Sequence, residues 1–245
     1  MHVVFGVASF SGLVDARGGL NWPPFAKALC DTMLECQNRG HKVTLLVHSR
    51  NPYIQAARNE LVAEFLETEG DVLFFLDDDL SWEPSSVLCL LQMSDEVVAG
   101  TYRMKCEEER YCGVLFTDAE DKPIARKNGA LAASQVATGF LRITRAALVN
   151  MILGHPEQRY TEYDEKGEVK SVMTDLFPQG VYNGRWVGED YAFCRLWKQL
   201  MGEIWLVPNL NITHWDRATG ASYPGNFHEF LLKQPGGSNA PREVK

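Results

Sequence analysis

Three consecutive aspartates, Asp77, Asp78 and Asp79, directly follow the apolar run Val72–Leu76. Such a run predicts a buried β-strand, and three like charges at its end repel one another and resist desolvation. A hard divalent cation removes that cost, because carboxylate oxygens are preferred ligands of Mg²⁺ and Mn²⁺. The alternative is a solvated acidic turn in which an aspartate caps the helix that begins at Pro84. The apolar strand in front of the acids favours the metal site.

If the strand continues through the acids, Asp77 and Asp79 share a face and can bind one ligand while Asp78 points elsewhere. In an open α/β sheet, ligands bind at the carboxyl ends of the strands. The pattern therefore predicts a metal site that holds a phosphate-bearing substrate.

Three further positions carry groups that suit such a site. Arg58 could reach a phosphate or a base edge, although an exposed helix arginine paired at i,i+4 explains it better when it is taken alone. Glu189 and Asp190 open a predicted helix, where capping and the helix dipole explain two acids as readily as a general base does. His214 is a lone histidine, which is more often structural, but imidazole suits Mn²⁺ beside carboxylates.

These residues must be positioned by an α/β fold. Strands are predicted at residues 2–9, 42–48, 72–76 and 96–102, with helices at 25–39, 52–69 and 84–93 between them. This alternation implies parallel strand pairing in a sheet covered by helices. Further along, strands are predicted at 111–117, 141–144 and 204–208, helices at 145–154 and 188–201, and a hairpin at 160–172.

Composition restricts the function classes. The chain has 245 residues, of which 45% are hydrophobic and 23% charged, as expected for one globular α/β domain. The net charge of −8 argues against a broad nucleic-acid-binding surface. The six cysteines form no C-x-x-C pair, so we expect reduced thiols in a cytoplasmic protein. Neither a signal peptide nor an apolar run long enough to cross a membrane is expected.

Taken in order, these signals resemble the GT-A glycosyltransferases, nucleotide-sugar-dependent enzymes with a D-x-D motif. The sequence looks most similar to the small, stand-alone transferases of phage and bacterial genomes. The resemblance runs from Val3 to about Phe230. The matching segments are residues 54–62, 73–79, 98–105, 137–141 and 188–194, together with His214.

The resemblance implies a fold and a division of the chain. The fold would be a GT-A, Rossmann-like α/β domain with a mixed, mainly parallel sheet flanked by helices. Residues 1–245 would form one domain, with a nucleotide-sugar-binding half at 1–105, an acceptor-binding half at 106–233 and a loose tail at 234–245.

The resemblance also implies site residues. Mn²⁺ or Mg²⁺ would be bound by Asp77, Asp79 and His214. Asp190, with Glu189 beside it, would be the base of an inverting reaction or would orient the acceptor in a retaining one. The nucleotide sugar would be bound by Ala8, Ser9, Arg58, Asn59, Asp77, Asp78 and Lys105, with Lys105 at the diphosphate. Members of the family often have proline where Arg103 stands and glycine where Asp216 stands, so the donor loop is expected to differ.

The implied reaction moves a sugar from a nucleotide-diphosphate sugar, with UDP-sugar favoured, to an acceptor hydroxyl. The acceptor would be a saccharide or a hydroxymethylated base in DNA. Four aromatic residues could stack on either acceptor, although core packing explains most of them better. They are Trp186, Trp215, Tyr223 and Phe227.

Two other functions remain open. A sugar-phosphate nucleotidyltransferase also joins a nucleotide to a carboxylate-bound metal and usually has a glycine-rich basic loop after its first strand. Arg17-Gly18-Gly19 is a thin version of that loop. A non-catalytic nucleotide-sugar-binding module is the third possibility, and loss of the acids would favour it, but Asp79 and Asp190 are both present.

Overall fold

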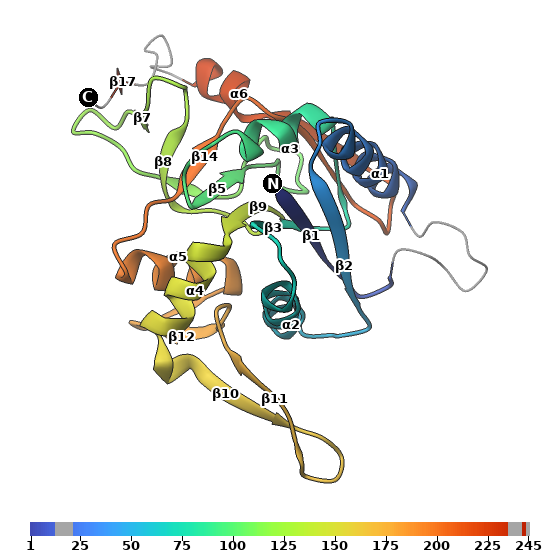
Figure 1. Ribbon diagram of the computed structural model, residues 1–245. Coiled ribbons are helices and arrows are strands. Elements are labelled where there is room, and N and C mark those ends of the chain that lie inside the picture. Colours follow the sequence, from blue (N-terminus) through green and yellow to red (C-terminus); the bar gives the residue numbers. More distant parts are fainter. Residues whose placement is uncertain (13–21, 235–241, 244–245) are drawn as a thin grey trace.

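The computed structural model describes residues 1–12, 22–234 and 242–243 (Figure 1). Strands and helices alternate through the first hundred residues, as predicted, except that the short strand β4 follows β3 directly. The elements are β1 His2–Ser9, α1 Pro23–Asn38, β2 Lys42–Ser49, α2 Ile54–Glu67, β3 Val72–Leu76, β4 Leu80–Trp82, α3 Pro84–Leu91 and β5 Val97–Gly100.

The second half contains more strands than the sequence predicts. Its first elements are β6 Val114–Leu115, β7 Ile124–Ala125, β8 Leu131–Gln135, β9 Phe140–Thr144, α4 Arg145–Gly154 and the short 3-10 helix Pro156–Gln158. They are followed by β10 Arg159–Tyr163, β11 Val169–Thr174, β12 Gly180–Tyr182, β13 Arg185–Val187, α5 Glu189–Gln199, β14 Trp205–Val207, β15 Asn211–Trp215, β16 Ser222–Asn226, α6 Phe227–Lys233 and β17 Arg242–Glu243. The predicted strand at 111–117 is reduced to β6, whereas the predicted hairpin is confirmed as β10–β11, which projects from the body in Figure 1.

Helix ends follow local sequence signals. Helix α1 begins at two prolines, whose fixed φ suits a first helical turn, and it ends before Gly40, which has a φ of 80°. Thr144 caps α4, because its Oγ1 accepts a hydrogen bond from the N–H of Ala147.

The central sheet is mixed and mainly parallel. Its strand order is β17-β7-β8-β14-β5-β9-β3-β1-β2, with β6 beside β8. The predicted parallel pairing is confirmed for β1 with β2 and β3. Strand β5 also has a parallel partner, β14, but it does not neighbour β3, because β9 lies between β3 and β5 and is antiparallel to both. Strands buried on both faces carry no alternating pattern from which their direction could be read.

Two hydrophobic clusters pack on the two faces of this sheet. Phe5 and Phe74 belong to the cluster that includes α1 and α3. Phe65, Phe75 and Phe193 belong to the other cluster, which α2, α4 and α5 complete. The sheet is therefore covered by helices on both faces. The ends of its strands remain uncovered, and these are where a ligand-binding site can form.

A small second sheet brings the end of the chain to the end of β3. Strand β15 pairs with β4 in antiparallel register, with His214 opposite Leu80. The backbone N–H of Trp215 donates to the carbonyl of Asp79 over 2.8 Å. This pairing fixes His214 beside the aspartates, although the two segments are far apart in sequence.

Among the described residues, no helix has the length and apolar character needed to cross a membrane. The predicted division into two functional halves stays a prediction. The predicted loose tail lies almost entirely outside the described residues, as does Arg17-Gly18-Gly19.

Candidate active site

The three aspartates form a turn, which we call the acidic loop (residues 77–79). Strand β3 ends at Leu76, and the N–H of Leu80 donates back to the carbonyl of Asp77 over 3.2 Å. The expectation that strand alternation would place Asp77 and Asp79 on one face is therefore wrong. Within a turn, each carboxylate points in its own direction, and each has a different cationic partner.

The first carboxylate belongs to a cluster around Arg58. Arg58 lies on α2, and the residue is 3% exposed. Its Nη2 donates to Asp77 Oδ1 over 3.1 Å, and its Nη1 donates to Glu189 Oε1 over 2.9 Å and to Asp190 Oδ1 over 2.8 Å. One buried cation thus joins three predicted site residues from both halves of the chain.

Burial and charge oppose each other in this cluster. Burial raises the pKa of Asp77 to about 6; the Arg58 guanidinium opposes the rise, and the nearby carboxylates Asp79 and Asp190 add to it. Burial disfavours the charged form of Arg58, but Asp77, Asp190 and Glu189 outweigh it and raise its pKa, so that Arg58 stays protonated.

Two polar residues that the sequence did not indicate complete this cluster. Thr138 donates from Oγ1 to Asp190 Oδ1 over 2.5 Å, and Tyr102 donates from its hydroxyl to Asp77 Oδ2 over 3.4 Å. Both lie in segments that the family resemblance covers. Both side chains are uncharged and mostly apolar or small, so no charge pattern in the sequence distinguishes these two residues as site members.

The third carboxylate faces His214. His214 Nδ1 lies 2.8 Å from the carbonyl of Arg103, and because a carbonyl only accepts, Nδ1 carries the proton. Nε2 then faces Asp79 Oδ2 at 3.3 Å, and Lys105 Nζ lies 2.5 Å from the same oxygen. Burial opposes ionisation of Asp79, but Lys105 and, in its doubly protonated form, His214 outweigh burial and lower the pKa of Asp79.

This pair meets a chemical test for a cation site. A metal-binding imidazole normally donates its other N–H to a carbonyl or carboxylate, as His214 does to Arg103. In that tautomer Nε2 offers a lone pair toward a carboxylate oxygen, an arrangement that a shared cation or an added proton stabilises. Within the described ranges, no three histidine, cysteine or acidic side chains gather as a metal site. The predicted ligand set with Asp77 as a third member stays a prediction.

The second carboxylate is paired with a residue that the sequence did not indicate. Arg217 donates from Nη1 to Asp78 Oδ2 over 2.5 Å and from Nη2 to Ser11 Oγ over 2.7 Å. Ser9 also donates to Asp78 Oδ2. Arg217 therefore links the loop after β15 to the acidic loop and to the end of β1. Its signal in the sequence was a basic residue three positions after His214.

Asp216, which stands where family members often have glycine, has its carboxylate bonded within its own turn. Its carboxylate accepts hydrogen bonds from the Thr219 hydroxyl and from the N–H groups of Ala218 and Thr219. These hydrogen bonds lower its pKa. The aspartate that stands in place of the family's usual glycine thus caps its own turn.

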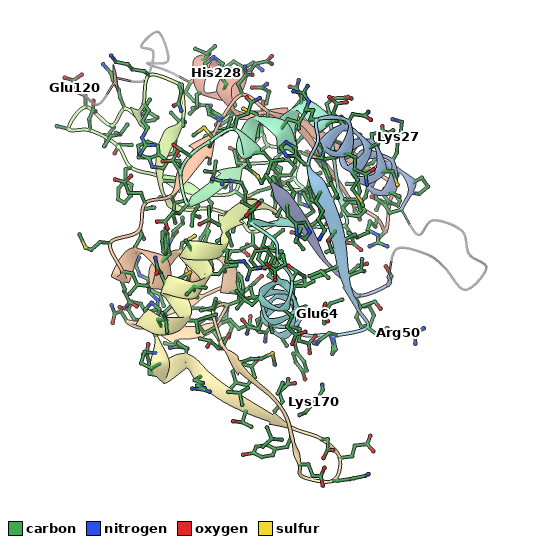
Figure 2. The ribbon with its side chains drawn as sticks, in the orientation of Figure 1. Lys27, Arg50, Glu64, Glu120, Lys170 and His228 are labelled. Carbon is green, nitrogen blue, oxygen red and sulfur yellow. The ribbon has the colours of Figure 1, made fainter. Side chains whose placement is uncertain are left out.

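A pocket of about 230 Å³ lies at the carboxyl ends of β1 and β2. It includes Ala8 and Ser9, the residues predicted to meet the nucleotide. At its edge, His48 lies between two carboxylates of α2, with Nδ1 2.7 Å from Glu60 and Nε2 2.8 Å from Glu64, which Figure 2 labels. The full lining is Ala8, Ser9, Phe10, His48, Asn51, Pro52, Ile54 and Ala57.

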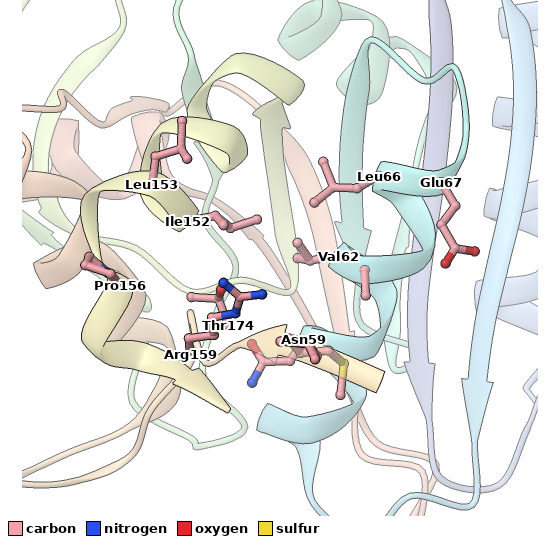
Figure 3. A pocket seen from close by; sticks show the side chains of 12 residues that line it. Asn59, Val62, Leu66, Glu67, Ile152, Leu153, Pro156, Arg159 and Thr174 are labelled. Carbon is pink, nitrogen blue, oxygen red and sulfur yellow. The ribbon is translucent and has the colours of Figure 1, made fainter. Parts of the chain in front are cut away.

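Asn59, predicted to bind substrate, faces a different pocket. Its Nδ2 donates to Asp175 Oδ1 over 2.8 Å, and its Oδ1 accepts from the N–H of Leu176 over 3.0 Å. It lines a pocket of about 510 Å³ between α2, α4 and β11, where Figure 3 also shows Val62 and Ile152. No residue of the acidic loop lines that pocket, so the larger cavity is separate from the charged site.

Comparison with known proteins supports the fold. No protein-family model matches the chain, and no curated protein matches it either. The solved structure of A197 from STIV is similar, with a TM-score of 0.51 and 17% identity over 92% of this chain and 95% of that chain. At this identity the likeness shows the fold alone, and it agrees with the predicted mixed, mainly parallel α/β domain.

Two further solved structures are less similar. GalNAc-T7 with UDP, GalNAc and Mn²⁺ has a TM-score of 0.45 and 14% identity over 87% of this chain and 44% of that chain. The inositol-1-phosphate CTP transferase from T. maritima has a TM-score of 0.40 and 10% identity over 90% of this chain and 91% of that chain.

Proposed function

We propose that the protein is a metal-dependent glycosyltransferase that moves a sugar from a nucleotide-diphosphate sugar, with UDP-sugar favoured, to an acceptor hydroxyl. The observation that carries the proposal is the Asp79–His214 pair at the end of β3. Asp79 Oδ2 and His214 Nε2, the two atoms that would bind the metal, lie 3.3 Å apart. The pocket at the ends of β1 and β2 shares Ser9 with this site, since Ser9 bonds Asp78. A nucleotide in that pocket would have its phosphates near the acidic loop.

The charge balance supports a divalent cation. Five carboxylates face three cationic side chains, which leaves an excess of two negative charges. A divalent cation would neutralise that excess. The carboxylates are Asp77, Asp78, Asp79, Glu189 and Asp190, and the cationic side chains are Arg58, Lys105 and Arg217.

Asp79 and His214 would hold Mn²⁺ or Mg²⁺, which when bound neutralises charge on the departing nucleoside diphosphate. Lys105 and Arg217 lie at the acidic loop and would bind the same diphosphate. Positioned cations of this kind stabilise the charge that develops on a leaving group.

Asp190 would accept the proton of the attacking acceptor hydroxyl. Both of its donors among the described residues, Arg58 and Thr138, bond Oδ1. Oδ2 is therefore left to take a proton, while the two donors hold the carboxylate in place. Glu189, on the same guanidinium, would help to fix Arg58. This arrangement suits an inverting displacement at the anomeric carbon.

A donor screen by thermal shift tests the proposal. UDP-, GDP-, CMP- and TDP-sugars are added with and without Mn²⁺, because a ligand of the folded state raises the melting temperature. We expect one nucleotide to give a metal-dependent shift. Asp79→Asn and His214→Gln should abolish the metal dependence, whereas Asp164→Asn, at the tip of the β10–β11 hairpin, should keep it.

A second variant separates binding from chemistry. Asp190→Asn should keep the donor shift and lower the transfer rate by about 100-fold or more, the usual contribution of a positioned base. Transfer at the wild-type rate would contradict the assignment of the base. Release of pyrophosphate from a nucleoside triphosphate, in place of nucleoside diphosphate from the sugar nucleotide, would identify a nucleotidyltransferase instead.

A further inference from the structure

The hairpin β12–β13 is a short, isolated element. Its two-residue turn, Asn183-Gly184, has φ values of 49° and 76°, the left-handed pair that closes a tight hairpin. Within the described residues it pairs with no other strand. A short two-stranded hairpin is at best marginally stable alone, so other contacts must hold it. The guanidinium of Arg195, on α5, lies 4.2 Å from the ring centroid of Tyr182.

The two faces of this hairpin differ sharply. Tyr182 is paired with Arg185 on the face that meets α5, and Val181 is paired with Trp186 on the opposite face. Val181 is 74% exposed and Trp186 is 70% exposed. Because both side chains lie largely in water, the indole of Trp186 and the isopropyl group of Val181 contribute nothing to the hydrophobic core. A paired, exposed apolar surface is the kind of feature that marks a binding site.

The position of this surface relates it to the proposed base. Trp186 precedes Asp190 by four residues, and the chain runs from β13 through Gly188 directly into α5. Four residues span at most about 14 Å even when fully extended. The Arg195–Tyr182 contact ties the hairpin to the helix that carries Asp190. A ligand on Trp186 therefore lies within a few sugar units of the acceptor-activating carboxylate.

Charge selects the class of ligand. A nucleic acid needs several cations spaced along its phosphates. This hairpin carries one exposed arginine, Arg185, while Arg195 stacks on Tyr182. The neighbouring site has an excess of two negative charges, and the chain has a net charge of −8. A neutral ring with an apolar face and polar edges suits this surface, and a polyanion does not.

We propose that Val181 and Trp186 form the acceptor platform, and that the acceptor is a neutral saccharide whose ring stacks on Trp186. This inference rests on the proposed glycosyltransferase function and narrows its acceptor to a saccharide. Hydroxymethylated DNA then becomes the competing result in the test.

The test compares Trp186→Ala with Tyr163→Ala, an aromatic that is 63% exposed on the β10–β11 hairpin. Binding of a panel of neutral gluco-, galacto-, manno- and N-acetylglucosamine oligosaccharides is measured by calorimetry without donor. Nucleoside diphosphate release is then measured with donor alone and with each saccharide. We expect Trp186→Ala to weaken saccharide binding and to raise the acceptor KM about tenfold, the effect of one lost stacking contact.

Trp186→Phe should recover part of the acceptor affinity that Trp186→Ala loses. Tyr163→Ala should match the wild type throughout. Three results would overturn the platform: no saccharide binding by the wild type, an unchanged acceptor KM in Trp186→Ala, or transfer only to hydroxymethylated DNA. Absence of donor hydrolysis and transfer, with saccharide binding intact and sensitive to Trp186, would instead overturn the proposed function.

Discussion

Replacing Arg58 by methionine removes the one cation shared by three carboxylates. Methionine keeps most of the apolar stem of the buried side chain, so the main loss is charge. Removing one partner of a buried ion pair costs about 3–5 kcal/mol, because the remaining charge is left uncompensated. The three acids keep side-chain exposures of 30%, 21% and 29%, so water relieves part of this cost. We therefore expect a loss near the lower end, about 3 kcal/mol at pH 7.5.

The loss should depend on pH in a defined direction. The folded-state pKa of Asp77, at about 6, is above its ordinary value of 3.8, so the folded state holds a proton that the unfolded state has released between these values. Stability from this group is present at low pH and is lost as the pH rises through 6. Because Arg58 lowers the pKa of Asp77, its removal raises that pKa. The pH range over which this stability is present therefore extends to higher pH. The variant should thus lose less stability at pH 5 than at pH 7.5.

Urea unfolding of the wild type and Arg58→Met at both pH values measures this effect. Arg39→Met is the matched control, because Arg39 pairs with Glu35 at an exposed i,i+4 position and should cost under about 0.5 kcal/mol. A loss below 1 kcal/mol at pH 7.5, or equal losses at the two pH values, would refute the assignment of Arg58 as the buried counter-ion of these acids.

Two further substitutions test the site. Arg217→Ala should raise the KM for the donor about tenfold by removing a charged phosphate ligand, and it should lower the melting temperature because the Asp78 side chain, 17% exposed, loses its cationic partner. Arg110→Ala, in an exposed pair with Glu108, should leave the KM unchanged. Equal donor KM values for the two variants would exclude a donor contact at Arg217. Gly139→Ala should destabilise the fold by about 1–3 kcal/mol and lower transfer, because a Cβ there would lie 2.3 Å from the Oδ2 of the first aspartate. Gly188→Ala meets no atom within 4 Å at a φ of −73°, so urea unfolding of the two variants should separate them, and equal stabilities would refute the close packing at Gly139.

The sequence predicted the elements that local patterns define. The strand Val72–Leu76 and the helix Arg145–Gly154 have the predicted bounds, because an apolar run and a capped periodic segment carry their own signals. The insertion of β9 between β3 and β5 could not be read, since both sides of these strands are apolar and long-range pairing has no local signature.

The structure brings together several charged residues that the sequence predicts as site members, but their pairing could not be predicted. Arg58, Asp77, Glu189 and Asp190 converge, although alone Arg58 is better explained as a surface residue. A buried arginine needs charged partners, but residues considered one at a time do not reveal them. Two partners of Arg58, Glu189 and Asp190, lie 131 and 132 positions away in the sequence. Arg217 was missed for a related reason, because a basic residue in a loop is ordinary until its neighbours are known.

The position of β9 also has a consequence for biosynthesis. While the chain emerges from the ribosome, β3 can pair with β1 as soon as both are available, but its other edge stays open until Phe140–Thr144 has been made. That edge belongs to Val-Leu-Phe-Phe-Leu, a short apolar segment that invites pairing with other chains. At translation rates of about 5–20 residues per second the exposure lasts seconds. Slower synthesis would lengthen this exposure of the β3 edge, and without chaperones the edge would be unprotected. The yield of soluble protein should therefore depend on chaperone supply more strongly than the stability of the finished fold would suggest.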